Sequence, residues 1–407
     1  MTGRTVVIGG GAAGIAAART LHEAGWDVLL IEAADRLGGR ARSVRLPTGH
    51  VVDHGCGWLH SAKRNPWTAI AEQAGFTIDR RSPNWQVQWN DLGFSPDEKR
   101  ASGEAHARFE EAAMTALDGP DRPLSDFVAA DDPWRPMIDA ISGYANGASL
   151  AQVSLHDWAA YENAATDDNW AVVEGYGTVI VNHASDMPVR TGVTASRIDH
   201  RGKTIRIETS RGTLEAEHVV IAVPTPVLAE GKLTFDPPLP AKQEAAAALP
   251  LGIADKVFLS VEGPLPWPAH AHLTGNPHSH CTASHRLSPF GWPIIESFFG
   301  GPCAEALEED DAAAQFAIDE LVRLLGSDWR RRLTPLDATR WRHAPLIGGS
   351  YSHAKVGHTK ARQALAQPVD DRLFFAGEAC SRDDFSTAHG AYETGVAAAR
   401  LIIHPAL

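Results

Sequence analysis

The stretch Thr5-Val-Val-Ile-Gly-Gly-Gly-Ala-Ala-Gly14 decides the fold of this chain. A β-branched run leads into Gly9, Gly11 and Gly14, and an alanine-rich stretch follows them. In a dinucleotide-binding fingerprint the first glycine allows a tight turn, the second lets the backbone approach a pyrophosphate, and the third lets the helix pack on the strand. The spacing therefore predicts a strand, a phosphate-binding turn and a helix over residues 12–24, with its positive end at the pyrophosphate.

A second strand and an acid complete this unit. Gly25 is a helix stop, and the apolar run Trp26–Ile31 predicts the second parallel strand. Glu32 then stands where a carboxylate can bond the two hydroxyls of a ribose. An acid at this position disfavours a ribose phosphate, so we expect NAD or FAD rather than NADP.

Another glycine-rich turn follows the acid, in Ala33-Ala-Asp-Arg36-Leu-Gly-Gly-Arg40. Arg36 and Arg40 can neutralise a diphosphate, although without the neighbouring glycines they would indicate only a surface ion pair. With its GxGxxG unit, acid and Leu-Gly-Gly-Arg turn, the chain resembles the FAD-dependent amine oxidase family, which includes monoamine and polyamine oxidases. The resemblance implies that FAD is the cofactor, with contacts from Gly9, Gly11, Ala13, Gly14, Glu32, Ala33 and Arg40.

The resemblance also implies the fold class, a Rossmann-like FAD-binding domain of the glutathione-reductase type interleaved with an α+β substrate-binding domain. The sequence has no internal repeat and no low-complexity linker, and its cofactor signals are scattered along the chain. We therefore expect residues 1–75, 187–245 and 346–407 in the FAD-binding domain. Residues 76–186 and 246–345 should form the substrate-binding domain.

Weaker patterns predict further elements. The β-branched runs Ile198–Thr209 and Val219–Val223 predict strands of the FAD-binding domain. Trp- and Ala-rich helical patterns fill the region from Phe76 to about Val181. An apolar stripe within residues 313–324, ended by a glycine, predicts a core helix without chemistry.

Composition limits the class of protein. The 407 residues are enough for roughly two or three domains. A formal net charge of −13 argues against a nucleic-acid partner and suits cationic substrates. The four cysteines form no CxxC or metal-binding pattern, so we expect thiols, no metal site and a cytoplasmic protein. No apolar run approaches the ~20 residues that cross a bilayer, so we expect no membrane contact. The oligomeric state stays open, with a homodimer among the alternatives.

The resemblance extends to the C-terminal segment, where Phe375-Ala-Gly-Glu378 and then Ala388-His-Gly-Ala match the family's second FAD signature. By that match Glu378 bonds ribityl hydroxyls, although a buried acid satisfied by backbone donors is the alternative. The helix from Ala388 would point its positive end at the flavin pyrimidine. His389 lies in this turn, where packing or capping is the more common role. The resemblance implies further cofactor contacts at Trp341, Gly377, Glu378, Thr387 and Ala388, and at Ala195, for which Val193 is the alternative register.

Lys256 is the most unusual charge in the sequence, because it lies in the apolar strand Ala254-Asp-Lys-Val-Phe-Leu259. A cation that faces inward there is costly unless it has a partner. On composition alone an edge-strand lysine facing solvent would be favoured. The family carries a lysine in this Lys-Val-Phe context, bonded through a water to flavin N5, so the resemblance makes Lys256 a catalytic candidate.

Tyr351 is the second catalytic candidate. It follows Gly349-Ser350, where the family places an aromatic residue beside the substrate amine, and an aromatic face attracts an amine. The second wall of the family's aromatic cage would stand at Thr387, so that wall is missing or comes from elsewhere. Ser350 occupies the position of the flavin-linked cysteine of monoamine oxidases, so we expect noncovalent FAD.

Trp58 and His60 complete the catalytic candidates. They lie in Asp53-His-Gly-Cys-Gly-Trp-Leu-His60, a glycine-rich turn that resembles the polyamine oxidase branch. Amino-acid oxidases of the family place a carboxylate-binding arginine where this chain has Trp58, which disfavours a carboxylate substrate. Core packing for Trp58 and a satisfied surface histidine for His60 are the alternatives. This turn adds flavin contacts at Gly55, Cys56, Gly57 and Trp58.

The leading hypothesis is a flavin amine oxidase that acts on a primary or secondary amine, with polyamines among the candidates. A hydride would pass from the amine Cα to flavin N5, the imine would be hydrolysed, and O2 would reoxidise the flavin to give H2O2. No second GxGxxG indicates NAD(P)H as electron donor, although an acceptor other than O2 stays open. The alternatives are a flavin desaturase or porphyrinogen-type oxidase, an L-amino-acid oxidase, and a catalytically silent FAD-binding interaction protein.

Overall fold

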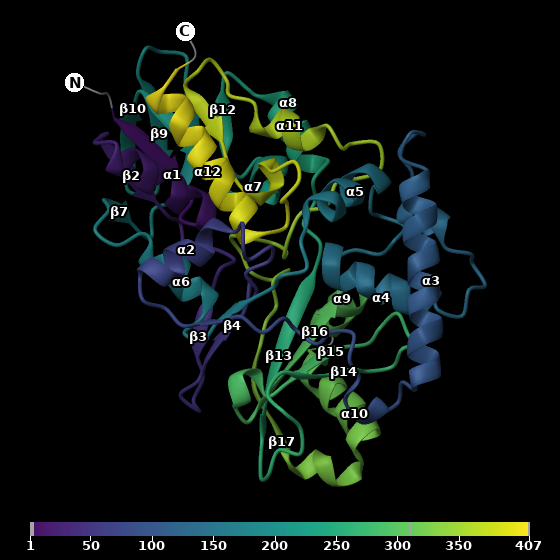
Figure 1. Cartoon of the computed structure of the whole chain (residues 1–407). Coiled ribbons are helices and arrows are strands. Elements are labelled where there is room, and N and C mark those ends of the chain that lie inside the picture. The colour runs from purple at the N-terminus through teal and green to yellow at the C-terminus, as the bar shows by residue number, and fades with distance from the viewer. Residues whose placement is uncertain (1–3, 310, 406–407) are drawn as a thin grey trace.

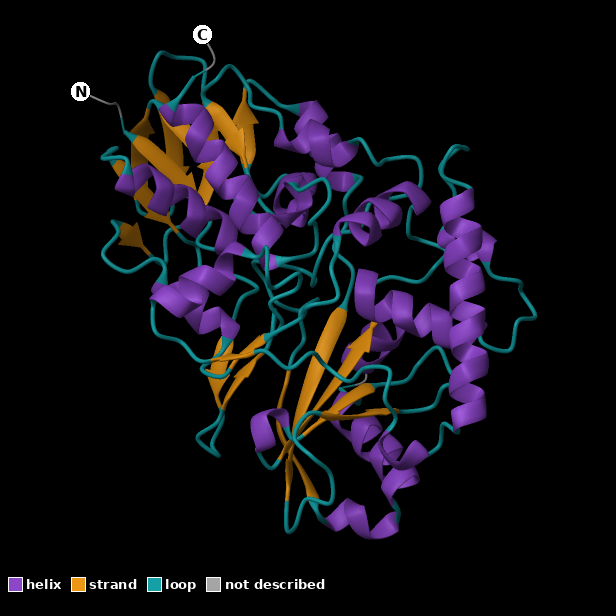
Figure 2. Cartoon of the chain, in the orientation of Figure 1, coloured by secondary structure: helices purple, strands orange, loops and turns teal. Residues whose placement is uncertain are grey.

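The computed structural model describes residues 4–309 and 311–405. Two lobes meet across the middle of the molecule (Figure 1). One lobe carries a parallel sheet with α1 and α12, and the other carries an antiparallel sheet with α3, α4, α9 and α10 (Figures 1 and 2). The expected fold class, a nucleotide-binding α/β domain interleaved with an α+β domain, is confirmed. The residue boundaries that we assigned to the two domains stay predictions.

The parallel sheet is built from stretches that lie far apart in the sequence. Its strands are β1 (Thr5–Ile8), β2 (Val28–Ile31), β7 (Val189–Arg190), β11 (His218–Ile221) and β18 (Leu373–Phe375). They lie in the order β18-β11-β1-β2-β7, and every neighbouring pair is parallel. Since the chain passes from β1 to one side at β2 and later to the other side at β11, the topology switches at β1. Ligands of such sheets bind beyond the carboxyl end of the strand at this switch.

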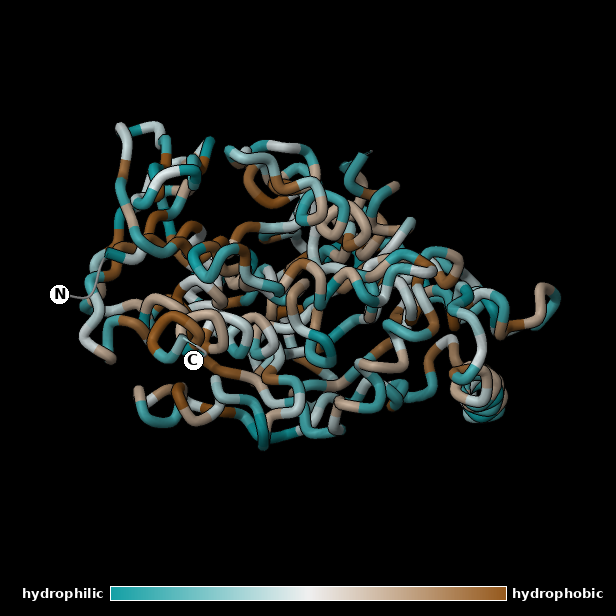
Figure 3. Tube along the Cα trace, turned by 90° about the horizontal axis from the view of Figure 1, so that it is seen from above, coloured by the Kyte–Doolittle hydropathy of each residue, from teal (hydrophilic) through white to brown (hydrophobic). Residues whose placement is uncertain are grey.

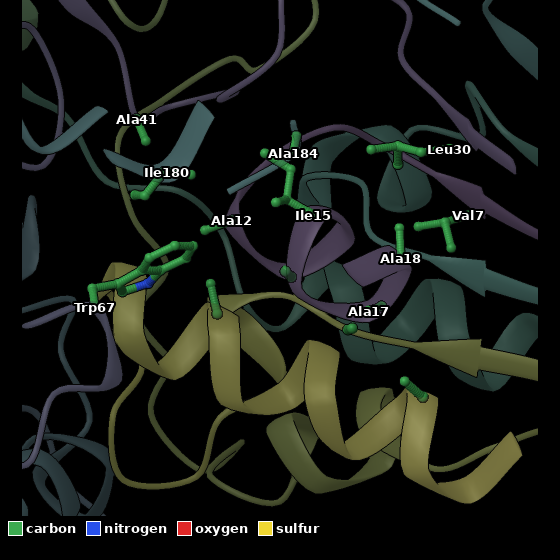
Figure 4. Packing of buried hydrophobic residues seen from close by; sticks show 14 of the residues in the cluster. Val7, Ala12, Ile15, Ala17, Ala18, Leu30, Ala41, Trp67, Ile180 and Ala184 are labelled. Carbon is green, nitrogen blue, oxygen red and sulfur yellow. The ribbon is translucent and has the colours of Figure 1, made fainter. Parts of the chain in front are cut away.

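Helices α1 (Ala12–Glu23) and α12 (Ala388–Ile403) cover one face of this sheet. Figure 4 shows α1 between α12 and the sheet residues Val7 and Leu30. The two helices approach so closely that a Cβ built on Gly395 would lie 2.1 Å from the carbonyl oxygen of Ala13. A Cβ on Gly14 would lie 1.8 Å from the oxygen of Gly9. Both glycines are therefore required by packing.

A second sheet covers the other face of the parallel sheet. Its order is β10-β9-β8-β12, with β8 (Ala195–Asp199), β9 (Ile205–Thr209), β10 (Gly212–Ala216) and β12 (Thr234–Asp236). The β-branched run Ile198–Thr209 covers the end of β8 and the whole of β9, because residues 200–204 turn the chain back and make the two strands an antiparallel pair. The predicted strand Val219–Val223 is β11, which ends at Ile221.

The other lobe is built on an antiparallel sheet of order β14-β15-β16-β13-β17. Its strands are β13 (Ala254–Val261), β14 (Ala271–Thr274), β15 (Ser284–Leu287), β16 (Ile294–Gly300) and β17 (Leu333–Ala338). One face packs on an apolar cluster with α9 and α10, while the other face points toward the FAD-binding lobe. The helices of this lobe are α3 (Pro96–Thr115), α4 (Arg135–Asn146), α5 (Leu155–Ala164), α9 (Gly301–Glu309) and α10 (Ala313–Leu325). The predicted core helix is α10, and Gly326 ends it as expected.

Further short elements complete the fold, and the helices among them pack on the FAD-binding lobe. They are β3 (Ser43–Arg45), β4 (Val51–Asp53), β5 (Ile78–Asp79), β6 (Ala171–Val172), α2 (Pro66–Gln73), α6 (Tyr176–Asn182), α7 (Thr225–Ala229), α8 (Pro240–Ala247) and α11 (Ala361–Ala366). Short 3-10 turns occur at Trp89–Asp91, Leu124–Phe127, Pro289–Gly291, Ser327–Arg331 and Glu378–Cys380.

The cysteines depart from the sequence prediction. Cys281 and Cys303 form a disulfide, so the expectation that all four cysteines are thiols is wrong for this pair. The two residues are 22 positions apart and show no local pattern, but β15 and β16 pair side by side and bring the flanking segments together. Cys56 and Cys380 are free thiols.

Hydrophobic segments follow the interior strands and helices, while hydrophilic segments run over the outside (Figure 3). The outermost helix, α3, is seen end-on in this view and mixes the two kinds of residue. Among residues 4–309 and 311–405, none of the helices combines the length and the hydropathy that a bilayer crossing requires.

Gly395→Ala should destabilise the protein by about 1–3 kcal/mol, because the added methyl group collides with the backbone of α1. Gly103→Ala is the matched control, since no described atom lies within 4 Å of a Cβ built on Gly103 in α3. Removing a helical glycine at such a site should stabilise by about 0.5–1 kcal/mol. Urea unfolding of the two variants measures both effects. Equal free energies of unfolding for the two would contradict the packing argument.

Candidate functional site

A cavity of about 1690 Å³ lies between the two lobes. Small-molecule sites usually have about 300–1,000 Å³, so this cavity has room for a dinucleotide and a second molecule. It brings together nearly all the site residues predicted from the sequence. The lining includes Gly9, Gly11, Ala13, Glu32, Ala33, Arg40, Gly55, Cys56, Gly57, Trp58, His60, Ala195, Lys256, Trp341, Tyr351, Gly377, Glu378, Thr387 and Ala388.

Gly14 and Ala195 differ from the other predicted cofactor positions. Gly14 does not line the cavity but lies behind the turn, against the oxygen of Gly9. Its role is therefore to bring α1 close to the turn. Val193 and Ala195 both line the cavity, so the structure does not choose between the two registers.

The turn after β1 fits a pyrophosphate. No described atom lies within 4 Å of a Cβ built on Gly11, so its backbone is open on that side. Gly9 has a φ of 105°, and a Cβ there would lie 2.4 Å from the oxygen of Ala222. At the end of β2, the carboxylate of Glu32 accepts hydrogen bonds from the amides of Gly10 (2.6 Å) and Ala34 (2.7 Å). The acid is thus fixed at the position where a ribose is expected.

The two arginines of the second turn have different partners. Arg36 donates to the carbonyls of Leu37 (3.1 Å) and Gly39 (2.9 Å), so it stabilises its own turn. Arg40 donates to Glu378 Oε1 (2.8 Å) and to the carbonyl of Ser350 (2.7 Å). Arg40 therefore joins the first FAD signature to the second, which the sequence did not predict.

Glu378 is buried and held on both sides of its carboxylate. Besides Arg40, it accepts hydrogen bonds from Ser352 Oγ (2.6 Å) and the amide of Ser386 (3.0 Å). Burial alone would raise the pKa of Glu378, but Arg40 and Arg362 outweigh it and hold the pKa below its usual value. Glu378 therefore presents a fixed, ionised acceptor to the cavity.

The N-terminus of α12 also faces the cavity. Thr387 is its N-cap and accepts a hydrogen bond from the amide of Gly390 (3.0 Å). The residue that the sequence suggested as a missing cage wall thus has a structural role. The first amides of a helix have no partner within the helix, so this end can stabilise negative charge. His389 is buried with its Nε2 3.0 Å from Asp384 Oδ1, which matches the packing role expected for it.

Lys256 reaches the cavity from β13. Its ammonium lies 2.9 Å from Glu296 Oε1 and donates to the carbonyl of Asp53 at 2.9 Å. A Cβ built on Gly57 would lie 3.2 Å from Lys256 Nζ, so the glycine leaves room for this cation. Lys256 thus faces inward, and Glu296 is the partner that makes its burial tolerable.

Aromatic side chains form another part of the wall. Trp58 packs edge-on against Trp85, with ring centroids 5.5 Å apart. His60 Nδ1 lies 2.6 Å from Asn169 Oδ1, and burial lowers the pKa of His60 to about 4. The hydroxyl of Tyr351 donates to a backbone carbonyl of α4, which leaves its ring to line the cavity. The wall is therefore aromatic and uncharged.

Sequence reasoning missed several cavity residues. Glu296 in β16 is a charge inside an apolar strand, the same signal that marked Lys256, whereas Arg286 lies in the polar strand β15, where a charge gives no such signal. Asn169 and Trp85 lie in segments without regular structure, where no pattern could identify them. Behind Glu378, the ion pair of Arg362 and Asp157 also went unnoticed, because its two members are 205 positions apart.

These features fit FAD and suggest chemistry on a neighbouring molecule. An open glycine turn, a fixed acid after β2 and two helix N-termini suit a dinucleotide with a ring system that accepts negative charge. The lysine and the aromatic wall line the same cavity as that cradle. In the described part of the chain, no three His, Cys, Asp or Glu side chains gather in a way that could hold a metal ion.

Comparisons with known proteins agree with this geometry. A sequence model of the family described as flavin containing amine oxidoreductase matches residues 12–403. Polyamine oxidase 2 of Arabidopsis thaliana is 32% identical over 435 residues, which cover 97% of this chain and 86% of that protein. Lysine-specific histone demethylase 1B of Mus musculus is 28% identical over 96% of this chain, which spans about half (52%) of that protein. A redesigned putrescine oxidase has a similar fold, with a TM-score of 0.79, 18% identity and coverage of 99% of each chain.

The low pKa of His60 predicts a pH effect on stability. Unfolded histidine titrates near 6.5, so between about pH 4 and 6.5 the unfolded chain binds more protons than the folded one. The contribution of His60 to stability should therefore be complete above that window and fall as the pH decreases through it.

When the pH falls from 7.5 to 4.5, the free energy of unfolding should decrease by about 2 kcal/mol less in His60→Gln than in the wild type. Urea unfolding of the cofactor-free protein at the two pH values measures this difference. His404→Gln, at an exposed histidine, is the control and should keep the wild-type dependence. A His60 variant with that same dependence would show that the ring is not held neutral.

Proposed function

Because the chain belongs to the family of flavin-containing amine oxidoreductases, we propose that it oxidises a primary or secondary amine with O2 and releases H2O2. The chain is an FAD-binding enzyme that acts on amines. What we propose beyond this is the class of amine that it oxidises and O2 as its electron acceptor. The observation that carries it is Lys256, whose ammonium lies above Gly57 beside the aromatic wall.

The chain's own residues account for most of the site's requirements. When bound, FAD accepts a hydride from the amine Cα and delivers the electrons to O2. Arg40 and Glu378 would hold the ribityl side, and the N-terminus of α12 would stabilise negative charge on the ring. Ser350, whose Oγ is engaged with Ala254, offers no thiol for a covalent link, so the FAD is noncovalent.

The ring of Tyr351 and the neutral His60 would receive the amine in its uncharged form, which has the lone pair that the reaction needs. Trp58 would close the site against water. Water re-entering after the reaction would hydrolyse the imine to an aldehyde or ketone and a smaller amine or ammonia. Per turnover, one amine, one O2 and one H2O would give the carbonyl product, the released amine and H2O2.

Polyamines are the substrate class that we propose. Polyamine oxidases are among the relatives, and two carboxylates, Glu110 and Glu162, line the cavity from α3 and α5. Burial and the charge of Glu110 raise the pKa of Glu162 to about 7, so a cation between them would be favoured. These acids would bind a second ammonium of an extended amine.

The alternatives fit the cavity less well. A desaturase substrate is apolar, whereas the cavity contains Lys256, Glu296 and Arg286. An L-amino-acid oxidase needs a free cation for the substrate carboxylate. Arg286 lies 4.3 Å above the Trp58 ring, but its donors are engaged with His270 (2.9 Å) and Glu296 (3.5 Å). The cytoplasmic location stays a prediction. It was based on four cysteine thiols, and the disulfide between Cys281 and Cys303 removes that support.

A peroxide-coupled screen tests the proposal, with mono-, di- and polyamines, amino acids and an apolar polyene as arms. We expect H2O2 with polyamines, and we expect Lys256→Met to slow flavin reduction by roughly a hundred-fold or more. Lys203→Met, at an exposed turn, is the matched control and should keep the wild-type rate. Turnover of amino acids alone would overturn the polyamine proposal, and an unchanged reduction rate in Lys256→Met would remove its assigned role.

A further inference from the structure

Three charged side chains lie together on the face of the antiparallel sheet that forms the cavity floor. Lys256, Glu296 and Arg286 come from the adjacent strands β13, β16 and β15. In the strand register, Glu296 lies opposite Arg286 of β15 and opposite Phe258 of β13. Lys256 is two residues from Phe258, so its side chain points to the same face of the sheet. The three side chains are only 9%, 13% and 15% exposed, so water screens them weakly.

One carboxylate serves two cations in this cluster. Glu296 Oε1 lies 2.9 Å from Lys256 Nζ, and Oε2 lies 3.5 Å from Arg286 Nη1. Burial would raise the pKa of Glu296, but Lys256 and Arg286 outweigh it and hold the pKa below its usual value. Glu296 is therefore ionised, and it separates two positive charges that would otherwise face each other.

Arg286 is fixed without the help of Glu296. Its guanidinium packs over the rings of Trp58 and Phe290, at 4.3 and 5.0 Å from their centroids. Its Nε and Nη2 donate to His270 Nδ1 at 3.2 and 2.9 Å. Removing the Glu296 charge should therefore leave the guanidinium in place, facing the ammonium of Lys256.

The other groups around Lys256 do not replace Glu296. The carboxylate of Asp53 is turned toward Ser43 and the amides of Tyr176 and Gly177, and only its carbonyl contacts Lys256. Burial lowers the pKa values of His54 and His60 and raises that of the Cys56 thiol, which keeps all three uncharged near neutral pH. Glu296 is thus the carboxylate within ion-pair distance of Lys256, and Arg286 is the cation that shares it.

We propose that Glu296 is a positioning residue that holds the Lys256 ammonium above Gly57 and sustains its positive charge against Arg286. Two of the three ammonium donors are used by Glu296 and the Asp53 carbonyl, so the third is directed into the cavity. Arg286 repels the Lys256 ammonium, and its guanidinium also holds the Trp58 ring in place. The catalytic use of this cation rests on the proposed function, but its charge can be measured without turnover.

The test compares two variants with opposite expected effects. In the cofactor-free protein, brief acetylation with acetic anhydride at pH 6 to 10, followed by mass spectrometry, reports how readily Lys256 reacts as the free amine. In Glu296→Gln the pH midpoint for Lys256 should move down, and at a fixed pH about two units below the wild-type midpoint labelling should rise about tenfold. In Arg286→Met the midpoint should move up, because the opposing cation is gone while Glu296 remains.

The exposed Lys203 serves as an internal reference for reagent activity, and Lys256→Met identifies the labelled peptide. Glu296→Asp, which keeps the charge, should restore most of the wild-type midpoint. Shifts in the same direction in both variants, or no shift in either, would overturn the proposal, because a purely structural defect gives no opposite signs. If Glu296→Gln does not fold, Arg286→Met and Glu296→Asp still decide the question.

A holoenzyme measurement completes the test. The pH profile of flavin reduction by the best amine should move in the same directions as the labelling midpoints. Absence of turnover with every amine would count against the proposed function alone, since the labelling result needs neither FAD nor substrate. Opposite labelling shifts with an unmoved reduction profile would overturn the positioning role in the reaction.

Discussion

The close crossing of α12 over α1 is the constraint on which the cofactor cradle depends. Gly395 meets the Ala13 carbonyl near the first turn of α1, but seven residues into α12. At 1.5 Å per residue, the N-terminus of α12 lies about 10 Å beyond the contact point. One helix end would therefore hold the pyrophosphate of a bound FAD, and the other would stabilise negative charge on its ring. A side chain at Gly395 would disturb both at once.

The antiparallel sheet keeps charged side chains next to an apolar core. Side chains alternate across a strand, so Val257 and Leu259 join the core behind the sheet while Lys256 faces the cavity. The same alternation in β16 places Ile295 in the core and Glu296 at the floor. The cations and the carboxylate thus come from strands whose hydrogen bonds fix their relative positions.

Sequence reasoning identified cavity residues where the pattern is local. The glycines after β1, the acid after β2 and the signature at Glu378 each occupy one short stretch, so their geometry follows from spacing. It failed where partners are distant. The pairing of Cys281 with Cys303, the partner of Lys256 and the bond between Arg40 and Glu378 all depend on packing between strands or lobes. The sequence carries a signal for the capping role of Thr387, since threonine before a helix is a common N-cap. The family resemblance instead predicts a wall of the aromatic cage at this position.

The cavity wall formed by α3 is one helix thick, with cavity residues such as Ser102, His106 and Glu110 on one side and solvent on the other. The cofactor cradle requires several distant stretches to keep their positions together, whereas this wall belongs to a single helix at the edge of the molecule. Substrate preference and cofactor binding can therefore change independently. A substitution in α3 can therefore change the amine specificity while the FAD-binding lobe and the Lys256 cluster of the antiparallel sheet are inherited intact.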